Sequence, residues 1–301
     1  MSTWRPDRPV TFTDGTLGCG AHHLAFCTRC CVDYTLMQEV SDVEEDLDSD
    51  DEEGDHTEDS SDYEDSSDSS ITFITSASER YTVSENANPL DYITRFSPPK
   101  DTDMPQTLFV TGHRALVPGP RFVRRSDRDQ ILIYTDGACP NNGKPSATAG
   151  CAFVFRPATP DSSHDGIVSF PLEKKDPSSV MYPPTSNRAE LRAVIAALQF
   201  RHWRGEGWSE LVIATDSEYV ALGATAWVRG WRRKGWMTNK NTPVKNRDLW
   251  ELLLETIKSL QLRVLFWRIP RDWNRLADSG AKAAALQDAP TKFSRIVGAL
   301  V

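Results

Sequence analysis

Residues 130–143, QILIYTDGACPNNG, constrain the fold of this chain more than any other stretch. Four apolar β-forming residues (131–134) are bounded by polar and turn residues, a pattern that predicts a strand covered on both faces. The strand ends at Asp136, and a polar loop follows. A carboxylate at the end of a buried strand is costly unless a cation pairs with it. Asp136 therefore either caps a turn or binds a metal ion, and the choice depends on the other carboxylates.

The pattern after this strand predicts an α/β domain. Further apolar runs suggest strands at residues 150–155, 167–172, 211–215 and 263–267. Helical spacing predicts helices at residues 186–203, 247–259 and 273–286, with a short one beginning at Ser217. The first three strands form an antiparallel meander, and helices and strands then alternate. We expect a five-stranded mixed sheet with helices on both faces.

A strongly acidic segment precedes this domain. Residues 39–68 hold 17 Asp and Glu residues and no Lys or Arg. Such a segment buries too little apolar surface to offset the entropy of ordering it, so we expect residues 38–70 to be disordered. The whole chain has a net charge of −9, whereas the rest of it has 34 basic and 26 acidic residues, a net charge of +8. The segment is either a solvated tail or a competitor that associates with the basic face in place of a polyanion.

The N-terminal segment, residues 1–37, contains four of the six cysteines, in CGAHHLAFCTRCC. The spacing C-x2-H-x4-C-x2-C predicts a tetrahedral zinc site, and His23 or Cys31 could replace its neighbour His22 or Cys30 as a ligand. The four ligands would be Cys19, His22, Cys27 and Cys30. The alternative is a thiol-rich turn packed against the main domain.

Residues 71–129 are interrupted by prolines at positions 98, 99, 105, 118 and 120. We expect a linker with strand-like pieces that dock onto a folded domain at residues 130–301. No apolar run approaches the roughly 18 residues that span a bilayer, and the N-terminus lacks a signal or transit pattern. These observations predict an intracellular monomer, in the nucleus or cytoplasm, with no membrane partner.

Three further carboxylates occupy places comparable to that of Asp136. Asp216 ends a predicted strand, Glu190 lies one turn into the first long helix, and Asp278 lies inside the last helix. Ligands of open α/β sheets bind at the carboxyl ends of strands. Clustered carboxylates repel one another unless cations neutralise them, and Mg²⁺ or Mn²⁺ prefers oxygen ligands of this kind.

Residues 131–286 resemble type 1 ribonuclease H. The matching stretches are YTDGACPNNG, TSNRAELRAVIAAL, VIATDSEYV and WNRLADSGAKAA, in the order and spacing of the family. The resemblance implies a ribonuclease H-like fold for residues 130–301 and cleavage of the RNA strand of RNA–DNA hybrids, which leaves 5′-phosphate and 3′-hydroxyl ends. It also implies that two Mg²⁺ or Mn²⁺ ions, roughly 4 Å apart, activate a water and stabilise the leaving oxygen. The implied catalytic ligands are Asp136, Glu190, Asp216 and Asp278.

The same resemblance implies which residues contact the substrate. Asn142, Ser186 and Asn187 match positions that contact 2′-hydroxyls, which distinguish RNA from DNA because they both donate and accept hydrogen bonds. Ser186 stands where Asn is common in the family, so its side chain reaches less far. Thr185 and Asn246 match positions that hold a phosphate of the DNA strand.

The segment WVRGWRRKGW, residues 227–236, resembles the basic handle of the family. Its cations would neutralise phosphates of the DNA strand, and its aromatic rings would pack against deoxyribose. The expected contacts are Trp227, Trp231, Arg232, Arg233 and Lys234. The alternative for the rings is packing between helices in the core, which we expect for Trp236.

One connection departs from the common pattern. Many family members have a His-containing loop before the last helix, whereas residues 269–274 read IPRDWN. The chain therefore resembles the variant that lacks the His loop, and we expect slower turnover, with Arg271 as a positive group nearby.

Two other functions compete with a hybrid-specific nuclease. A non-catalytic nucleic-acid-binding module with the same fold would not need four clustered carboxylates. A nuclease or transferase acting on DNA is disfavoured by the Asn142 and Asn187 loops and by the basic handle.

Overall fold

The computed structural model describes residues 88–114, 119–158 and 166–298, and short stretches nearer the N-terminus at residues 9–11, 13, 17–19, 26–27 and 32–33. In those short stretches β1 (Pro9–Thr11) pairs with β2 (Leu17–Cys19), and β3 (Phe26–Cys27) pairs with β4 (Val32–Asp33). The predicted acidic segment, the residues His22 and Cys30, and the side chains of Cys19 and Cys27 lie outside what the structure describes. The predicted zinc site therefore stays a prediction.

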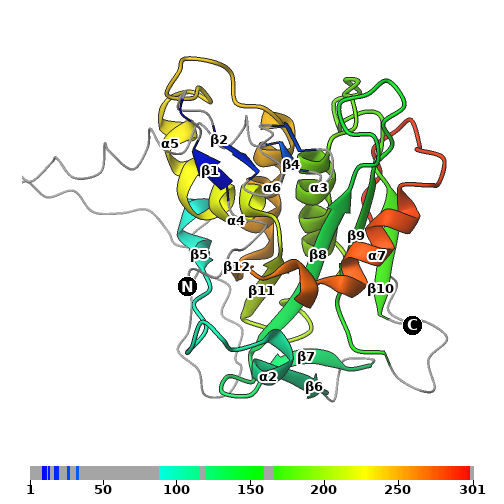
Figure 1. The fold of residues 1–301 in the computed structure, drawn as a ribbon. Coiled ribbons are helices and arrows are strands. Elements are labelled where there is room, and N and C mark those ends of the chain that lie inside the picture. Colours follow the sequence, from blue (N-terminus) through cyan, green and yellow to red (C-terminus); the bar gives the residue numbers. More distant parts are fainter. Residues whose placement is uncertain are drawn as a thin grey trace, which may run out of the picture.

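A mixed sheet of eight strands forms the centre of the domain (Figure 1). Its main order is β10-β9-β8-β11-β12-β5, and β7 pairs with both β6 and β8. β8, β9 and β10 form an antiparallel meander, whereas β11, β12 and β5 follow β8 in parallel. The strands are β5 (Ile93–Arg95), β6 (Phe109–Gly112), β7 (Arg121–Arg124), β8 (Gln130–Ala138), β9 (Gly150–Val154), β10 (Ile167–Pro171), β11 (Glu210–Thr215) and β12 (Arg263–Arg268).

The predicted mixed α/β fold is confirmed, but the predicted number of five strands was too low. The three additional strands, β5, β6 and β7, lie in the proline-interrupted stretch before residue 130. Each has only three or four residues, so pairing with neighbouring strands stabilises it more than its own sequence does. β5 adds to the sheet beside β12, where Ile93 pairs with Val264.

Helices cover both faces of the sheet, as predicted. Because side chains alternate across a strand, Ile131 and Ile133 of β8 face one core while Leu132 faces another. The first core includes residues of α3 (Ser186–Gln199) and α6 (Arg247–Leu260). α7 (Arg275–Ala284) lies on the opposite face, over β9.

Gly150 lets α7 approach β9 closely. A Cβ atom at this position would lie 2.3 Å from the carbonyl oxygen of Ala281, a distance that no real side chain tolerates. Small buried residues on α7, Ala277 and Ala284 among them, complete the contact. This packing sets the depth at which α7 presents its side chains at the sheet edge.

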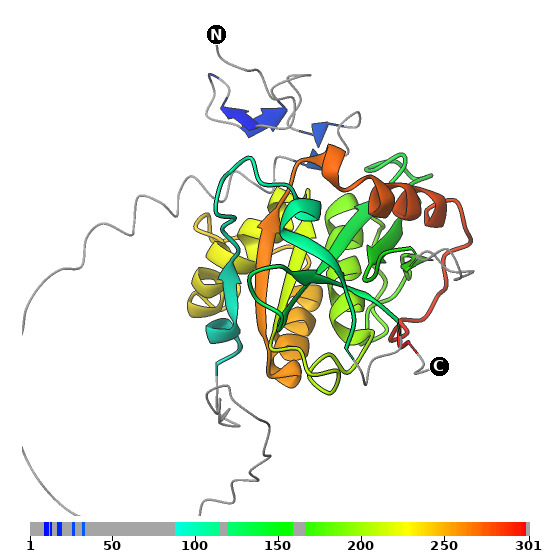
Figure 2. The ribbon, with the colours of Figure 1, turned by 90° about the horizontal axis from the view of Figure 1, so that it is seen from below.

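The segment before β8 covers part of the sheet face on which Leu132 lies (Figure 2). Phe96 and Phe109 pack with Leu265 and Trp267 of β12 in one buried cluster. The ring centroids of Phe96 and Trp267 are 4.7 Å apart. The described residues between Ile93 and Arg124 therefore supply part of the core of the domain.

The remaining helices are short. They are η2 (Pro89–Tyr92), α2 (Pro105–Leu108), α4 (Glu218–Leu222), the π-helical η3 (Gly223–Trp227), α5 (Val228–Arg233) and η4 (Arg271–Trp273). In the part of the chain that the structure describes, no helix has the length and apolar character of a membrane span.

Candidate active site

Asp136 and Asp216 leave the sheet at the same edge. β8 and β11 are parallel neighbours with Tyr134 paired to Ala214, and each Asp follows its paired residue by two positions. The parallel register therefore places both carboxylates at the carboxyl ends of adjacent strands, where we expected a ligand site.

Gly137 brings Glu190 to this edge. A Cβ atom on Gly137 would lie 2.1 Å from the backbone nitrogen of Glu190, so only glycine allows α3 to cross β8 this closely. Because Gly137 directly follows Asp136, the close approach sets the first turns of α3 beside that carboxylate. Glu190 is buried, and so is Asp136.

Burial and neighbouring negative charge raise the pKa of two of these carboxylates. Burial raises the pKa of Asp136 well above its ordinary value, and the charges of Asp216 and Glu190 raise it further. Burial, together with the charge of Asp216, raises the pKa of Glu190 to about 8, although the Ser217 hydroxyl that donates to Glu190 opposes this shift. Carboxylates that disfavour one another's ionised form in this way attract a cation.

Neighbouring donors fix the orientation of two of the carboxylates. Oδ1 of Asp136 accepts from the backbone N–H of Gly137 at 2.8 Å. Oδ2 of Asp216 accepts from Nε of Arg271, and Oδ1 accepts from Nδ2 of Asn274, each at 2.8 Å. Asp216 thus meets a cation that comes from the connection without the His loop.

The fourth predicted carboxylate, Asp278, forms an ion pair on its own helix. Its Oδ2 pairs with Nζ of Lys282 at 2.7 Å, one turn further along α7. Across the described ranges, no three His, Cys, Asp or Glu side chains are close enough together to hold a metal ion. Asp136, Glu190 and Asp216 therefore lie near enough to affect one another's charge without converging on one metal position, while Asp278 pairs with Lys282 on its own helix.

Asn274 lies between Asp278 and the ends of β8 and β11. Its Nδ2 donates both to Asp216 and to the carbonyl oxygen of Thr135, the latter at 3.0 Å. Its backbone carbonyl oxygen accepts from the backbone nitrogen of Asp278 at 3.0 Å. Asn274 thus ties β8, the end of β11 and the start of α7 together beside the carboxylates.

The three residues predicted to contact 2′-hydroxyls are buried and carry unsatisfied polar atoms. Asn142 lies in the loop after β8, and Ser186 and Asn187 form the first turn of α3. Asn142 Oδ1, Ser186 Oγ and Asn187 Nδ2 have no hydrogen-bond partner among the residues the structure describes. Buried polar atoms without a partner are uncommon in proteins and call for an explanation.

The two residues predicted to hold a phosphate lie at the N-termini of α3 and α6. Thr185 caps α3, and its Oγ1 accepts from the backbone nitrogen of Arg188. Asn246 precedes α6 with a φ of 57°, a left-handed conformation that Asn tolerates better than most residues. Its Nδ2 donates to the hydroxyl of Tyr219 at 3.2 Å.

The handle presents its cations but not its tryptophans. Arg232, Arg233 and Lys234 are exposed. Trp227 and Trp231 are 3% and 5% exposed and pack in the main core, which favours the alternative of core packing, and contact of their rings with substrate stays a prediction. Helical spacing turns both rings toward Tyr219 and Trp250, which bury them. Trp236 is buried, as predicted.

Sequence reasoning gave no role to Gly137, Ser217 or Asn274. A glycine directly after the strand-end Asp136 was the available signal for a close helix contact. The hydrogen bonds of Ser217 and Asn274 depend on how separate elements meet, and no local pattern indicates them.

Comparison with known proteins agrees with this geometry. The RNase H family model matches residues 128–285. A ribonuclease H of Treponema pallidum is 38% identical over 157 residues, which cover 52% of this chain and 90% of that protein. A ribonuclease H of Thermus thermophilus is 32% identical over 179 residues, which cover 56% of this chain and 96% of that protein. The chain therefore belongs to the RNase H family and is an enzyme of the ribonuclease H type.

Proposed function

We propose that this protein is an endoribonuclease that hydrolyses the RNA strand of RNA–DNA hybrids. The observation that supports this most strongly is the set of three coupled carboxylates, Asp136, Glu190 and Asp216, at one edge of the sheet. Asp278 would be the fourth catalytic carboxylate. To join the other three, the Asp278 side chain would have to leave Lys282, while the backbone bond from Asp278 to Asn274 keeps the start of α7 in place. The relatives named ribonuclease H support the same substrate class.

The chemistry of the donor set suits hard divalent cations, and binding them would draw the carboxylates closer together than they lie here. All four proposed ligands are carboxylates, and oxygen ligands suit Mg²⁺ or Mn²⁺. Two such ions, when bound, supply Lewis-acid stabilisation of the phosphoryl charge and acidify a bound water. Asp136, Glu190, Asp216 and Asp278 would hold the ions, with Asp136 near both Glu190 and Asp216. Ser217 and Asn274 keep the partner carboxylates oriented.

We further propose that the unsatisfied atoms of Asn142, Ser186 and Asn187 recognise the RNA strand. Once local side-chain movement exposes these buried atoms, a 2′-hydroxyl can donate to Asn142 Oδ1, accept from Asn187 Nδ2, and do either with Ser186 Oγ. Leaving each atom buried without a partner costs about 1–3 kcal/mol, which a bound RNA strand would recover and a DNA strand would not. This difference gives the site a physical basis for selecting RNA.

The DNA strand would lie along Thr185, Asn246 and the handle cations. The backbone of that strand carries one negative charge per phosphate, and the exposed Arg232, Arg233 and Lys234 can neutralise part of it. The proposed products are RNA fragments with 5′-phosphate and 3′-hydroxyl ends.

Incubation with an end-labelled RNA–DNA hybrid, an RNA duplex and a DNA duplex, each with Mg²⁺, tests the proposal. We expect cleavage of the RNA strand of the hybrid only, and products that an RNA ligase accepts because they carry 5′-phosphate and 3′-hydroxyl ends. Binding of the hybrid without cleavage would support the non-catalytic module instead, and cleavage of the DNA duplex would support a DNA nuclease.

A further inference from the structure

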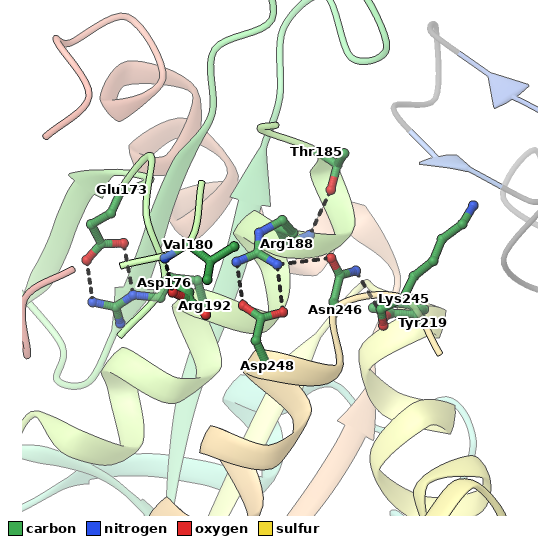
Figure 3. A network of polar contacts seen from close by, with 10 residues as sticks. All are labelled: Glu173, Asp176, Val180, Thr185, Arg188, Arg192, Tyr219, Lys245, Asn246 and Asp248. Carbon is green, nitrogen blue, oxygen red and sulfur yellow. Dashed lines mark hydrogen bonds and ion pairs between the residues drawn. The ribbon is translucent and has the colours of Figure 1, made fainter. Parts of the chain in front are cut away.

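Arg188 is bonded to both residues of the proposed phosphate site (Figure 3). It lies in the first turn of α3, and its backbone nitrogen donates to Oγ1 of Thr185 at 3.3 Å. Its guanidinium donates to Oδ1 of Asn246 at 3.4 Å. The same guanidinium forms two bonds to Asp248, in the first turn of α6, at 2.9 and 2.7 Å.

The Arg188–Asp248 pair is rigid and shielded from solvent. The two side chains are 6% and 11% exposed. The ring of Tyr182 stacks on the guanidinium, whose central carbon lies 4.0 Å from the ring centroid. A bidentate pair fixes both planes, which a single contact from a lysine would not do. The pair therefore locks the N-terminus of α3 to that of α6.

The Arg188 guanidinium also orients the side-chain amide of Asn246. The Arg188 guanidinium donates to the amide oxygen of Asn246. The amide nitrogen of Asn246 therefore points away from Arg188 and donates one of its two hydrogens to the Tyr219 hydroxyl. One N–H donor is left. An Asn that precedes a helix usually caps it through its oxygen, whereas here the side chain makes no cap bond.

The backbone N–H of Arg188, rather than its guanidinium, orients the Thr185 hydroxyl, and the Arg188–Asp248 pair fixes only where the helix end that carries Thr185 lies. The hydroxyl oxygen of Thr185 accepts from the backbone of Arg188, so the hydroxyl hydrogen remains available to donate. Both residues therefore present donors, which is what an anionic phosphate requires.

We propose that Arg188 is a positioning residue, which through Asp248 presents the Thr185 hydroxyl and the Asn246 amide as a donor pair to one phosphate of the DNA strand. This inference rests on the proposed function, because it assumes that Thr185 and Asn246 contact that strand. Arg188 itself touches no substrate; it acts by fixing the distance between the two helix ends and the orientation of their side chains.

The chain offers a matched control on the same helix. Arg192, one turn after Arg188, forms a buried pair with Glu173 at 2.7 Å, also drawn in Figure 3. It also donates to the carbonyl oxygen of Ser294, and within the described residues none of its hydrogen bonds reaches Thr185 or Asn246. Arg188→Lys and Arg192→Lys each keep the charge, lose the bidentate geometry and destabilise the same helix.

The first measurement compares KM, kcat and the melting temperature of the two variants. We expect Arg188→Lys to raise KM for the hybrid about tenfold, the effect of losing a hydrogen bond to a charged group, with kcat within about twofold of the unaltered protein. Arg192→Lys should lower the melting temperature by a comparable amount and leave KM unchanged. Equal effects of both variants on KM would reduce Arg188 to a merely structural role and overturn the proposal.

The second measurement uses hybrids in which a single DNA phosphate is replaced by an uncharged methylphosphonate, scanned along the strand. We expect one position at which this change raises KM of the unaltered protein, and expect that sensitivity to vanish both in Thr185→Ala/Asn246→Ala and in Arg188→Lys. Sensitivity that persists in Thr185→Ala/Asn246→Ala, or no sensitive position at all, would show that the proposed phosphate contact is wrong. Sensitivity that vanishes there but persists in Arg188→Lys would overturn the positioning role alone.

Discussion

Nε of Arg271 lies 2.8 Å from Oδ2 of Asp216, so a side chain from the connection without the His loop reaches into the carboxylate site. The charge of Arg271 also lowers the pKa of Asp136 and of Glu190, against the effects that raise them. A cation of the protein thus already offsets part of the negative charge that a divalent ion would neutralise.

Removing this cation should strengthen metal binding. We predict that Arg271→Ala lowers the dissociation constant for Mg²⁺ about three- to tenfold, because unit charges a few Å apart interact by about 1 kcal/mol or more near a protein surface. Isothermal titration calorimetry of the free protein measures this constant. Arg275→Ala, which removes an exposed pair with Asp272, is the control. Weaker Mg²⁺ binding by Arg271→Ala than by the control would contradict the interpretation.

The stability of the metal-free protein should fall as pH rises. The pKa of Glu190 is about 8 in the folded protein, against 4.5 for an ordinary Glu, so between these pH values the folded state binds more protons than the unfolded state. The free energy of unfolding should therefore decrease from about pH 5 to about pH 8, by an amount on the order of a few kcal/mol. Urea denaturation in EDTA measures it.

Glu190→Gln supplies the control for this pH dependence. Because Gln does not titrate, the slope should flatten in this variant, and Mg²⁺ added near the folded-state pKa of about 8 should restore stability in the unaltered protein. A free energy of unfolding that rises with pH over the same range in EDTA would contradict the raised pKa.

The handle cations should control how strongly salt weakens substrate binding. Reversing Arg232, Arg233 and Lys234 to Glu should raise KM and reduce the slope of log KM against log salt by up to about three, one for each lost phosphate contact. Lys258→Glu, an exposed reversal near the far end of α6, should leave the slope unchanged. If the slope of the triple variant equals that of the unaltered protein, the handle does not contact phosphates.

The segment before β8 should contribute to the stability of the whole domain. Phe96 is 3% exposed and packs on Trp267, so Phe96→Ala should lower the free energy of unfolding by about 3 kcal/mol, the usual cost of truncating a buried Phe. Val297→Ala, at an exposed position, should change it by less than about 0.5 kcal/mol. Chemical denaturation compares the two, and equal effects would mean that the segment is not part of the core.

Much of this fold was predictable because its strands are long apolar runs. β8 and β11 stood out from their sequences, and their ends located Asp136 and Asp216. β5 did not, since three residues become a strand only where β12 offers an edge to pair with. The sequence left Trp227 ambiguous because a Trp next to basic residues fits both a core and a nucleic-acid surface.

The side-chain orientations and bonding partners of the site residues could not be predicted from the sequence. That Asp216 meets Arg271, or that Asp278 turns to Lys282, follows from where separate side chains meet. The unsatisfied atoms of Asn142 and Ser186 likewise become evident only once burial is known. Residue type and spacing located the site, and tertiary packing decided the partner of each side chain.

The rate of RNA-strand cleavage in a single RNA–DNA hybrid with Mg²⁺, compared between the unaltered protein and Asp136→Asn, tests the central claim most directly. Asn keeps the size of the side chain and removes the charge that couples to Asp216 and Glu190. We predict that the unaltered protein cleaves the hybrid and that Asp136→Asn is slower by about a thousandfold while it still binds the hybrid. No cleavage by the unaltered protein, or equal cleavage by the variant, would contradict the account.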